Sequence, residues 1–334
     1  MSNKKKIAVV TGGAGFIGSH MVDFLLKKNF YVNVIDNLSG GRIDNLKRHF
    51  KNKKFKFENK NICKLDKNHR FFKSCDFVFH FAGIGDIVPS IENPIRYFEN
   101  NVIGTSKVLE ASKKASVKKF VYAASSSCYG IAKTPTSETH KINPLYPYAM
   151  SKYLGEKLCF HWHKLYKLPV NSIRIFNAYG PRVKTTGVYG AVFGVFFKQK
   201  LENKPLTIVG NGNQKRDFTY VTDVIDAFYK AASTKLSGHV FNLGTGSPKS
   251  INYLVKIIGG KKTYIPKRPG EPNTTCANPN KIRKLLKWKP KVKFENGVHI
   301  MLNEIKKWKS APLWTPEKIK KATKLWFGYM KDVG

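Results

Sequence analysis

The sequence has 334 residues, and 60 lysines and arginines against 21 aspartates and glutamates give it a formal net charge of +39 at pH 7. This length suffices for a sizeable core in one large domain or two closely joined ones. No apolar run reaches the roughly 18 residues of a membrane span. The five cysteines are scattered without a Cys-x-x-Cys pair, which argues against a disulfide framework and a metal site. The first expected strand directly follows a short polar N-terminus, so we expect no signal peptide and a cytoplasmic protein.

The lysines are spread along the whole chain, and no basic arm, zinc finger or separate basic helix stands out. A large positive charge can indicate a nucleic-acid or membrane partner when it is concentrated on one segment or face. We interpret the dispersed lysines as a solvated surface that favours anionic substrates such as nucleotides. We expect no nucleic-acid partner and no membrane insertion.

A glycine-rich turn near the N-terminus connects a short apolar strand, residues 7–10, to an apolar-periodic helix. Gly12 permits the tight turn, Gly15 allows the backbone to approach a pyrophosphate, and Gly18 allows the helix to pack on the strand. The first N–H groups of such a helix bind phosphate. The spacing therefore predicts a dinucleotide site, provided that a second strand with an acidic end follows.

That second strand is expected over residues 31–35 and ends in Asp36, eighteen residues after Gly18. A carboxylate at this position accepts hydrogen bonds from a ribose diol and repels a 2′-phosphate. The sequence therefore favours NAD over NADP. We interpret Arg42, in the loop that follows, as a solvated residue and not as a phosphate ligand.

Strands and helices alternate through about residue 180, which predicts a parallel sheet covered on both faces. The expected fold is α/β, a Rossmann-like doubly wound parallel sheet with a smaller α/β C-terminal substrate-binding region. We expect residues 1–176 to form the NAD-binding domain, with a return contribution from about 215–245, and residues 177–334 to form the nucleotide-sugar-binding region with a helical tail. Further strands are expected at 55–59, 76–82, 120–124, 170–176 and 241–243, and helices at 101–115, 147–167 and 222–232. Within the fourth strand, we interpret His80 as a core histidine.

Polar residues follow the strand that ends near Ala124, and a tyrosine–lysine pair follows them. Ser125 lies at the edge of the sheet where ligands bind in open parallel sheets. Tyr148 and Lys152 are four residues apart and share one helical face. A phenol with a pKa near ~10 is a poor base at neutral pH, but an adjacent ammonium lowers that pKa and makes tyrosine usable as a proton shuttle.

The C-terminal half contains single arginines in loops, namely Arg182, Arg216 and Arg268. Guanidinium groups match phosphate oxygens, so together these arginines indicate a second, phosphate-bearing ligand. From about Thr315 the pattern predicts one amphipathic helix that presents Ile319, Ala322, Trp326 and Tyr329.

With these residues, the chain resembles the extended short-chain dehydrogenase/reductases, in the branch of nucleotide-sugar epimerases near UDP-glucose 4-epimerase. The resemblance covers roughly residues 5–308. It depends on the glycine turn, the 148/152 pair and three further segments, Asn177 with residues 179–182, residues 216–218 and residues 268–271.

The resemblance implies that Tyr148 takes the proton of the sugar 4-hydroxyl, that Lys152 binds the nicotinamide ribose, and that Ser125 shares the proton relay. It also implies that the uridine diphosphate binds to Asn177 and to two arginines of the C-terminal region, and that Ser126 and Thr275 contact the sugar. The substrate-binding positions are thus Ser125, Ser126, Asn177, Arg216, Arg268 and Thr275.

The family also implies positions for NAD, together with one departure from its pattern. Asn61 stands where the family usually has an aspartate near the adenine amino group, and its amide oxygen can still accept that hydrogen bond. The cofactor-binding positions are Gly12, Gly15, Phe16, Ile17, Gly18, Asp36, Asn37, Asn61, Ile62, Phe81, Ala82, Tyr148 and Lys152. No metal is implied.

Related branches start from the same 4-keto sugar but need further groups. Ser126 and Ser127 occupy the positions where 4,6-dehydratases usually carry Asp-Glu, and decarboxylases typically have a glutamate in this segment. The sequence therefore favours plain 4-epimerisation of a UDP-hexose, with a dehydratase, a decarboxylase or a 2-epimerase as the alternatives. A non-catalytic basic nucleotide-binding protein is the alternative from another class.

Thr275 lies seven residues after Arg268, where a bulky tyrosine in the family closes the pocket around the sugar 2-substituent. The small threonine predicts that the pair UDP-GlcNAc/GalNAc fits as well as UDP-Glc/Gal. The pair UDP-GlcA/GalA is also possible, with Ser126, Ser127 or Thr186 receiving the carboxylate. The family resemblance further implies a homodimer formed through helices at about 100–115 and 149–166.

Overall fold

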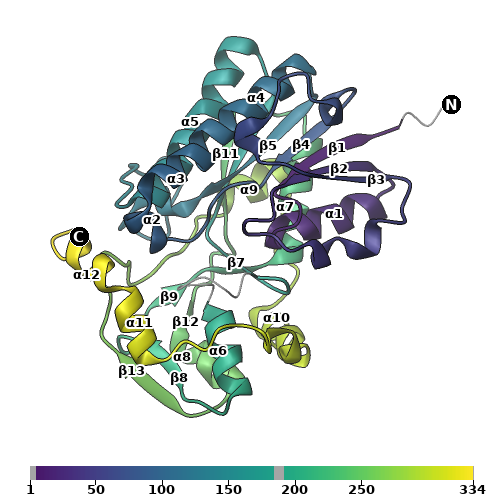
Figure 1. Cartoon of the computed structure of the whole chain (residues 1–334). Coiled ribbons are helices and arrows are strands. Elements are labelled where there is room, and N and C mark those ends of the chain that lie inside the picture. The colour runs from purple at the N-terminus through teal and green to yellow at the C-terminus, as the bar shows by residue number, and fades with distance from the viewer. Residues whose placement is uncertain (1–4, 184–191, 334) are drawn as a thin grey trace.

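The computed structural model describes residues 5–183 and 192–333, and its centre is one parallel sheet of seven strands in the order β11-β6-β5-β4-β1-β2-β3 (Figure 1). The order runs outward in both directions from β1 and β4, which is the doubly wound arrangement that the sequence predicts. In the register, Val10 of β1 lies opposite Val34 of β2 and Phe79 of β4. The strands are β1 (Ile7–Thr11), β2 (Tyr31–Asp36), β3 (Phe55–Asn59), β4 (Phe77–His80), β5 (Lys119–Ser125), β6 (Val170–Ile175) and β11 (His239–Leu243).

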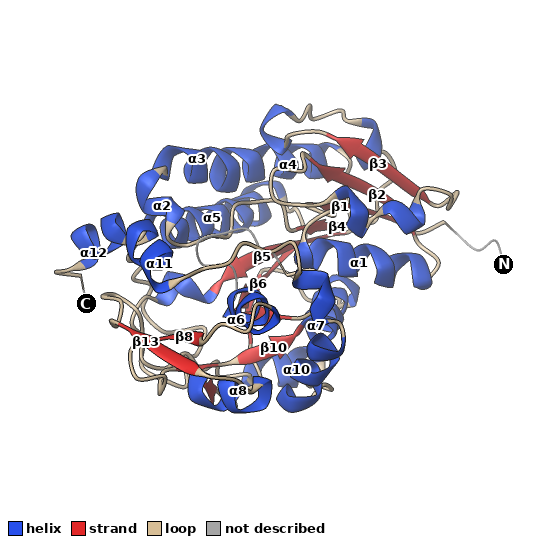
Figure 2. Ribbon diagram, turned by 60° about the horizontal axis from the view of Figure 1, so that its bottom comes forward, coloured by secondary structure: helices blue, strands red, loops and turns tan. Residues whose placement is uncertain are grey.

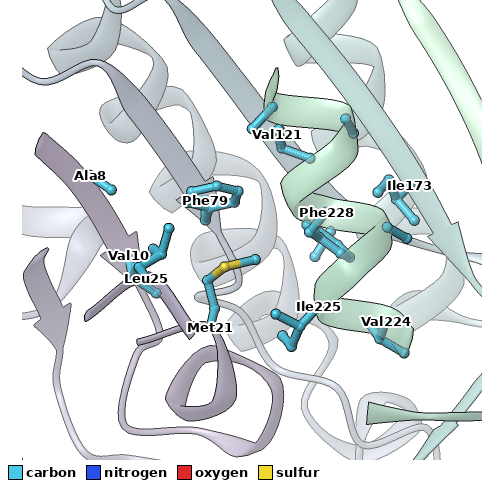
Figure 3. Packing of buried hydrophobic residues seen from close by; sticks show 14 of the residues in the cluster. Ala8, Val10, Met21, Leu25, Phe79, Val121, Ile173, Val224, Ile225 and Phe228 are labelled. Carbon is cyan, nitrogen blue, oxygen red and sulfur yellow. The ribbon is translucent and has the colours of Figure 1, made fainter. Parts of the chain in front are cut away.

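Helices cover both faces of this sheet, because successive strand residues point to opposite faces and both sets are apolar. On one face, α1 (Phe16–Lys27) and α7 (Val221–Ser233) pack on alternate strand residues, as Figure 3 shows for Met21 and Phe228 beside Phe79. On the other face lie α4 (Gly104–Lys114) and α5 (Pro147–Tyr166). Neither face of the sheet is left to solvent.

The C-terminal region forms a second core below the sheet in Figure 1. Phe193, Phe218 and Leu254 are buried there with other aromatic and aliphatic side chains. Its strand pairs are β7 (Asn177–Tyr179) with β10 (Phe218–Tyr220), β9 (Lys215–Arg216) with β12 (Lys249–Ser250), and β8 (Leu206–Val209) with β13 (Lys262–Ile265). Its helices are α6 (Val192–Leu201), α8 (Ile251–Ile258) and α10 (Phe294–Asn303), whereas α9 (Asn280–Leu286) packs with α7 and β11 in the core of the large sheet.

The expected helix over 101–115 begins differently from the prediction. A π-helical turn, Glu99–Ile103, precedes α4, and two short helices, α2 (Pro89–Glu92) and α3 (Pro94–Phe98), precede the turn. Asn101 lies in this turn, fully buried and hydrogen-bonded outside the helix, so tertiary contacts override the helical pattern. Short 3-10 turns occur at Ile43–Asn45, Lys47–His49, Ile62–Lys64, Arg70–Phe72, Ser126–Tyr129 and Ile305–Trp308.

The prediction of one C-terminal helix is wrong, since the tail forms α11 (Pro316–Ala322) and α12 (Lys324–Met330). The break falls at Thr323, whose buried hydroxyl donates to the carbonyl oxygen of Ile319 over 2.8 Å. Trp326 is buried as expected, whereas Tyr329 is 68% exposed. In Figures 1 and 2 the two helices lie between α2 and β13. Among the described helices, none has the length and apolar character needed to cross a membrane.

Candidate active site

The glycine turn has the geometry that a dinucleotide requires. Gly12 has a φ of +70°, and a Cβ there would lie 2.6 Å from the backbone nitrogen of Ala82. A Cβ on Gly18 would lie 2.1 Å from the carbonyl oxygen of Gly12, so helix α1 packs on the turn only without a side chain. Gly15 caps α1, and no side chain satisfies the first amides of this helix. These amides are suited to bind phosphate oxygens.

The Asp36 carboxylate lies at the end of β2 and holds the turn in place. One oxygen accepts a hydrogen bond from the Ala14 amide over 2.9 Å, and the other accepts from the Leu38 amide over 2.8 Å. Burial raises the pKa of Asp36, and these two hydrogen bonds oppose that rise. Each carboxylate oxygen has a second lone pair, so the group can also accept hydrogen bonds from a ribose diol.

A cleft of about 440 Å³ extends from the glycine turn to α5. Asn61 lies on its wall, with its side-chain oxygen accepting from the Cys63 amide over 2.9 Å. The wall also contains the loop after β4, residues 83–86, and Arg96. The loop could have been predicted, because ligands bind at the carboxyl ends of parallel strands, whereas no motif indicated Arg96. All expected cofactor positions line this cleft, namely Gly12, Gly15, Phe16, Ile17, Gly18, Asp36, Asn37, Asn61, Ile62, Phe81, Ala82, Tyr148 and Lys152.

The three expected catalytic residues meet at one end of the cleft. Ser125 ends β5, and Tyr148 and Lys152 come from the first turns of α5. The Ser125 hydroxyl is hydrogen-bonded to Tyr148 and accepts from the Ser127 amide over 3.2 Å. The Lys152 ammonium lies 4.4 Å from the ring centroid of Tyr122. This arrangement places a hydroxyl, a phenol and an ammonium beside the dinucleotide cleft.

The charges at this end differ from the expectation in one respect. Burial raises the pKa of Tyr148, and the hydrogen bond from Ser125 only partly opposes it. Burial also lowers the pKa of Lys152 to about 8. The cost of burying a phenolate therefore exceeds the stabilisation that Lys152 was expected to give.

Two buried polar residues position the surroundings of the pair. His80 is fully buried between Thr11 and Thr105, with ring nitrogen to hydroxyl distances of 2.6 and 2.9 Å. Burial lowers its pKa to about 3, so the ring is neutral, as expected of a core histidine. Asn101 donates to the Ser151 hydroxyl and accepts from the Ile84 amide, which fixes the loop after β4 against α5.

A second cavity, of about 240 Å³, is lined by Asn177, Arg216 and Arg268, and it shares Ala178 with the first. Glu271 also lines this cavity, and one of its oxygens lies 2.7 Å from Arg268. Glu271 lies in the segment 268–271, whose pattern predicted no role for this carboxylate. The two arginines and an adjacent amide suit a diphosphate.

Of three residues that were expected to contact the ligand, two line neither cavity and the third is not described by the structure. Thr275 donates to the side-chain oxygen of Asn177 over 3.0 Å and is not among the residues that line either cavity. Ser126 lies in the 3-10 turn after Ser125 and also lines neither. Thr186 lies outside the described residues.

Arg182, which was expected to help bind phosphate, does not line either cavity. Its guanidinium lies 2.6 Å from the Asp23 carboxylate of α1 and so serves an ion pair inside the protein. No group of three or more His, Cys, Asp or Glu side chains suited to a metal occurs among the described residues.

The doubly wound sheet, the glycine turn and the tyrosine–lysine pair define an extended short-chain dehydrogenase/reductase that uses a dinucleotide. The family model described as GDP-mannose 4,6 dehydratase matches residues 9–301, and the chain belongs to this family of NAD-dependent epimerases and dehydratases.

The chain is similar to several proteins that are named as UDP-sugar 4-epimerases. A protein from Methanocaldococcus jannaschii named putative UDP-glucose 4-epimerase is 37% identical, over 89% of this chain and 98% of its own. The structure of a UDP-N-acetylglucosamine 4-epimerase from Methanobrevibacter ruminantium has a TM-score of 0.84 at 31% identity, covering 90% of this chain and 99% of that one. The structure of a UDP-glucuronic acid 4-epimerase from Bacillus cereus, solved with UDP-glucuronic acid and NAD, has a TM-score of 0.84 at 34% identity, with the same coverage.

Proposed function

We propose that the protein is an NAD-dependent nucleotide-sugar 4-epimerase that acts on a UDP-hexose through a transient 4-keto sugar. The observation that carries this proposal is the adjacency of the two cavities. Tyr148 and Lys152 line one, Arg216 and Arg268 line the other, and Ala178 belongs to both. A sugar held by its diphosphate at the arginines would therefore extend toward the tyrosine.

The chain's own residues supply the proton chemistry. The phenol of Tyr148 takes the proton of the sugar 4-hydroxyl and returns it, and Ser125 shares this proton through its hydrogen bond. When bound, NAD would supply a hydride acceptor for C4 and a positive nicotinamide charge that would lower the pKa of the phenol. The Lys152 ammonium would hold the nicotinamide ribose. Because the same C–H and O–H bonds break and re-form, the reaction is an isomerisation without net oxidation.

The diphosphate contacts explain why the ketone is not released. A group tethered at one end has a high effective concentration at the other, so the keto sugar can turn and react on its opposite face. Arg216 and Arg268 provide this tether.

The alternatives require side chains that the site lacks. The family model has a dehydratase name, but Ser126 and Ser127 stand where a dehydratase needs an acid and a base. The same segment contains no glutamate for decarboxylation. A non-catalytic nucleotide-binding protein would not explain why Ser125, Tyr148 and Lys152 meet in the dinucleotide cleft, and a 2-epimerase would need its chemistry at C2 instead of at the 4-hydroxyl.

The sugar is proposed from the residues near Asn177. Thr275 is hydrogen-bonded to Asn177 on the wall of the second cavity, and it is small where the family resemblance implies a bulky tyrosine, which favours a sugar with an N-acetyl group. We therefore place UDP-GlcNAc/GalNAc first, ahead of UDP-Glc/Gal and UDP-GlcA/GalA. The products are sugar donors suited to polysaccharide biosynthesis.

We also propose a cytoplasmic homodimer. The face formed by α3, the π-helical turn and α5 carries exposed apolar side chains, namely Ile95, Ile103, Met150, Leu165 and Tyr166. Burying this face against a second copy would remove it from water. Within each copy, residues 1–176 with 215–245 would bind NAD and the remainder of 177–334 would bind the nucleotide sugar.

The test is a proton NMR time course of the purified protein with UDP-GlcNAc, UDP-glucose and UDP-glucuronate in separate tubes, without added NAD. We expect the C4 epimer in at least the first tube, which would also show that the protein retains NAD. No epimer in any tube, even after NAD is added, would contradict the proposal.

A further inference from the structure

The C-terminal tail packs directly on the segment that carries Arg268. The indole N–H of Trp326 donates to the carbonyl oxygen of Pro269 over 3.0 Å. The terminal methyl of Met330 occupies the space beside Gly270, 2.4 Å from where a Cβ would stand. Trp326 and Met330 are each only 2% exposed, so these contacts form a small core of their own.

The same indole also contacts the start of the catalytic helix. Its ring centroid lies 5.3 Å from that of Tyr146, and Tyr146 in turn stacks on Tyr148 with ring planes 8° apart. Tyr146 is further fixed by a hydrogen bond with Ser127. One tail residue thus links the arginine-bearing loop to the residues around the catalytic tyrosine.

The first tail helix reaches the second cavity itself. Ile319 of α11 lies on the cavity wall, as does Ile87, which packs on the small core around Trp326. The start of the tail is held by Gln199 of α6, whose amide donates to the Trp314 carbonyl over 2.8 Å. The tail therefore closes one side of a cavity whose other walls come from the matched part of the chain, residues 9–301.

We propose that two residues of the tail belong to the nucleotide-sugar site, Trp326 of α12 as a positioning residue for the loop of Arg268 and Ile319 of α11 as a wall of the nucleotide pocket. This inference rests on the proposed function for the nature of the ligand, a uridine diphosphate. Trp326 acts through Pro269 and Tyr146 and touches no reacting atom.

The first experiment measures UDP binding by calorimetry and kinetics on the full-length protein. We expect Trp326→Ala to weaken UDP binding about tenfold and to raise KM for the UDP-sugar by a similar factor, while NAD content stays unchanged. Trp326→Phe keeps a ring against Tyr146 but removes the N–H donor, so its effect should be intermediate. Tyr329→Ala, at a residue of α12 that is 68% exposed, is the matched control and should bind UDP like the wild type.

A second measurement does not require any substitution. If the docked tail strengthens UDP binding, UDP must stabilise the docked tail by the same factor. Hydrogen exchange of the amides in residues 316–330 should therefore slow about tenfold on saturation with UDP, and NAD alone should change it much less.

The outcomes separate the two proposals. The inference would be overturned if Trp326→Ala changes the UDP affinity by less than twofold and UDP saturation changes the exchange rates of the tail amides by less than twofold. The proposed epimerase activity would not be contradicted by that result. Binding of UDP without epimerisation would contradict the proposed reaction while the tail results still hold. Failure of the wild-type protein to bind UDP would overturn both.

Discussion

The Arg268 guanidinium lies 2.7 Å from the Glu271 carboxylate, and the same carboxylate lies 3.7 Å from Arg216. Two cations of the second cavity thus share one anion before any ligand enters. A diphosphate would have to compete with Glu271 for both guanidinium groups. The negative charge of the carboxylate would also repel the diphosphate in this partly buried site.

Glu271→Gln should therefore bind UDP more tightly, by about three- to tenfold at low salt, and lose this advantage as salt screens the charges. Calorimetric titration with UDP at two ionic strengths checks the prediction. Uridine, which lacks phosphate, is the control ligand and should bind both proteins alike. Weaker UDP binding by the variant would mean that Glu271 contacts the ligand directly.

Tyr148→Phe should reduce kcat by about 10²–10⁴-fold, since the variant keeps the ring but loses the hydroxyl that exchanges the proton. UDP affinity and NAD content should change little. The epimerisation rate from proton NMR checks this, with Tyr264→Phe, at an exposed tyrosine of β13, as the control. A variant that retains wild-type kcat would exclude Tyr148 as the proton-transfer group.

The lowered pKa of Lys152 makes the lysine costly for stability. Its pKa is about 8 in the folded protein against 10.5 ordinarily, so the unfolded chain binds the extra proton between these values. Burial of Lys152 therefore lowers the free energy of unfolding by its full amount below pH 8, and this penalty disappears as the pH rises toward 10.5.

Lys152→Met should raise the free energy of unfolding at pH 7 by about 2 kcal/mol and flatten the pH dependence between 8 and 10.5, while epimerase activity is lost. Urea unfolding at pH 7 and pH 10 measures both effects. If Lys152→Met instead lowers the free energy of unfolding equally at both pH values, packing of the lysine stem contributes more to stability than its charge does.

A buried ion pair links the catalytic helix to the sheet. Glu156 of α5 accepts from Arg174 of β6 at 2.5 Å and from the Ser172 hydroxyl at 2.8 Å, and Arg174 donates to the Tyr129 hydroxyl at 2.7 Å. Glu156→Ala should destabilise the protein by about 3–5 kcal/mol, because it leaves a buried guanidinium without its anion.

Replacing both partners tests whether the loss comes from that uncompensated charge. The double variant Glu156→Leu/Arg174→Met should be more stable than Glu156→Ala, as measured by urea unfolding, since it buries no charge. If the double variant is the less stable of the two, the hydrogen bonds to Ser172 and Tyr129 carry the stabilisation instead.

Local patterns were enough to predict the sheet and the dinucleotide turn. Spacing alone predicts the roles of Gly12 and Gly18, because Gly12 has the positive φ of a tight turn and Gly18 packs on the carbonyl of Gly12, six residues earlier. The pair Tyr148 and Lys152 was also accessible, since four residues on a helix fix their common face.

The remaining features depend on contacts between distant residues. Arg182 pairs with Asp23, 159 positions earlier, and no local signal distinguishes it from the arginines that face the second cavity. The raised pKa of Tyr148 reflects burial by the assembled protein, which spacing cannot report. The break at Thr323 and the docking of Trp326 on Pro269 likewise require the folded partner segments.

The sheet order has a consequence for the growing chain. Strand β11 (His239–Leu243) pairs with β6, so β6 remains an unpaired edge until residue 243 has been synthesised. Until α7 has formed, Val121 and Ile173 also lack their cover. An exposed strand edge beside uncovered apolar side chains is a template for aggregation. A fragment that ends at residue 176 would retain both features permanently, and the nascent chain carries them for at least 67 residues of translation, from 176 to 243.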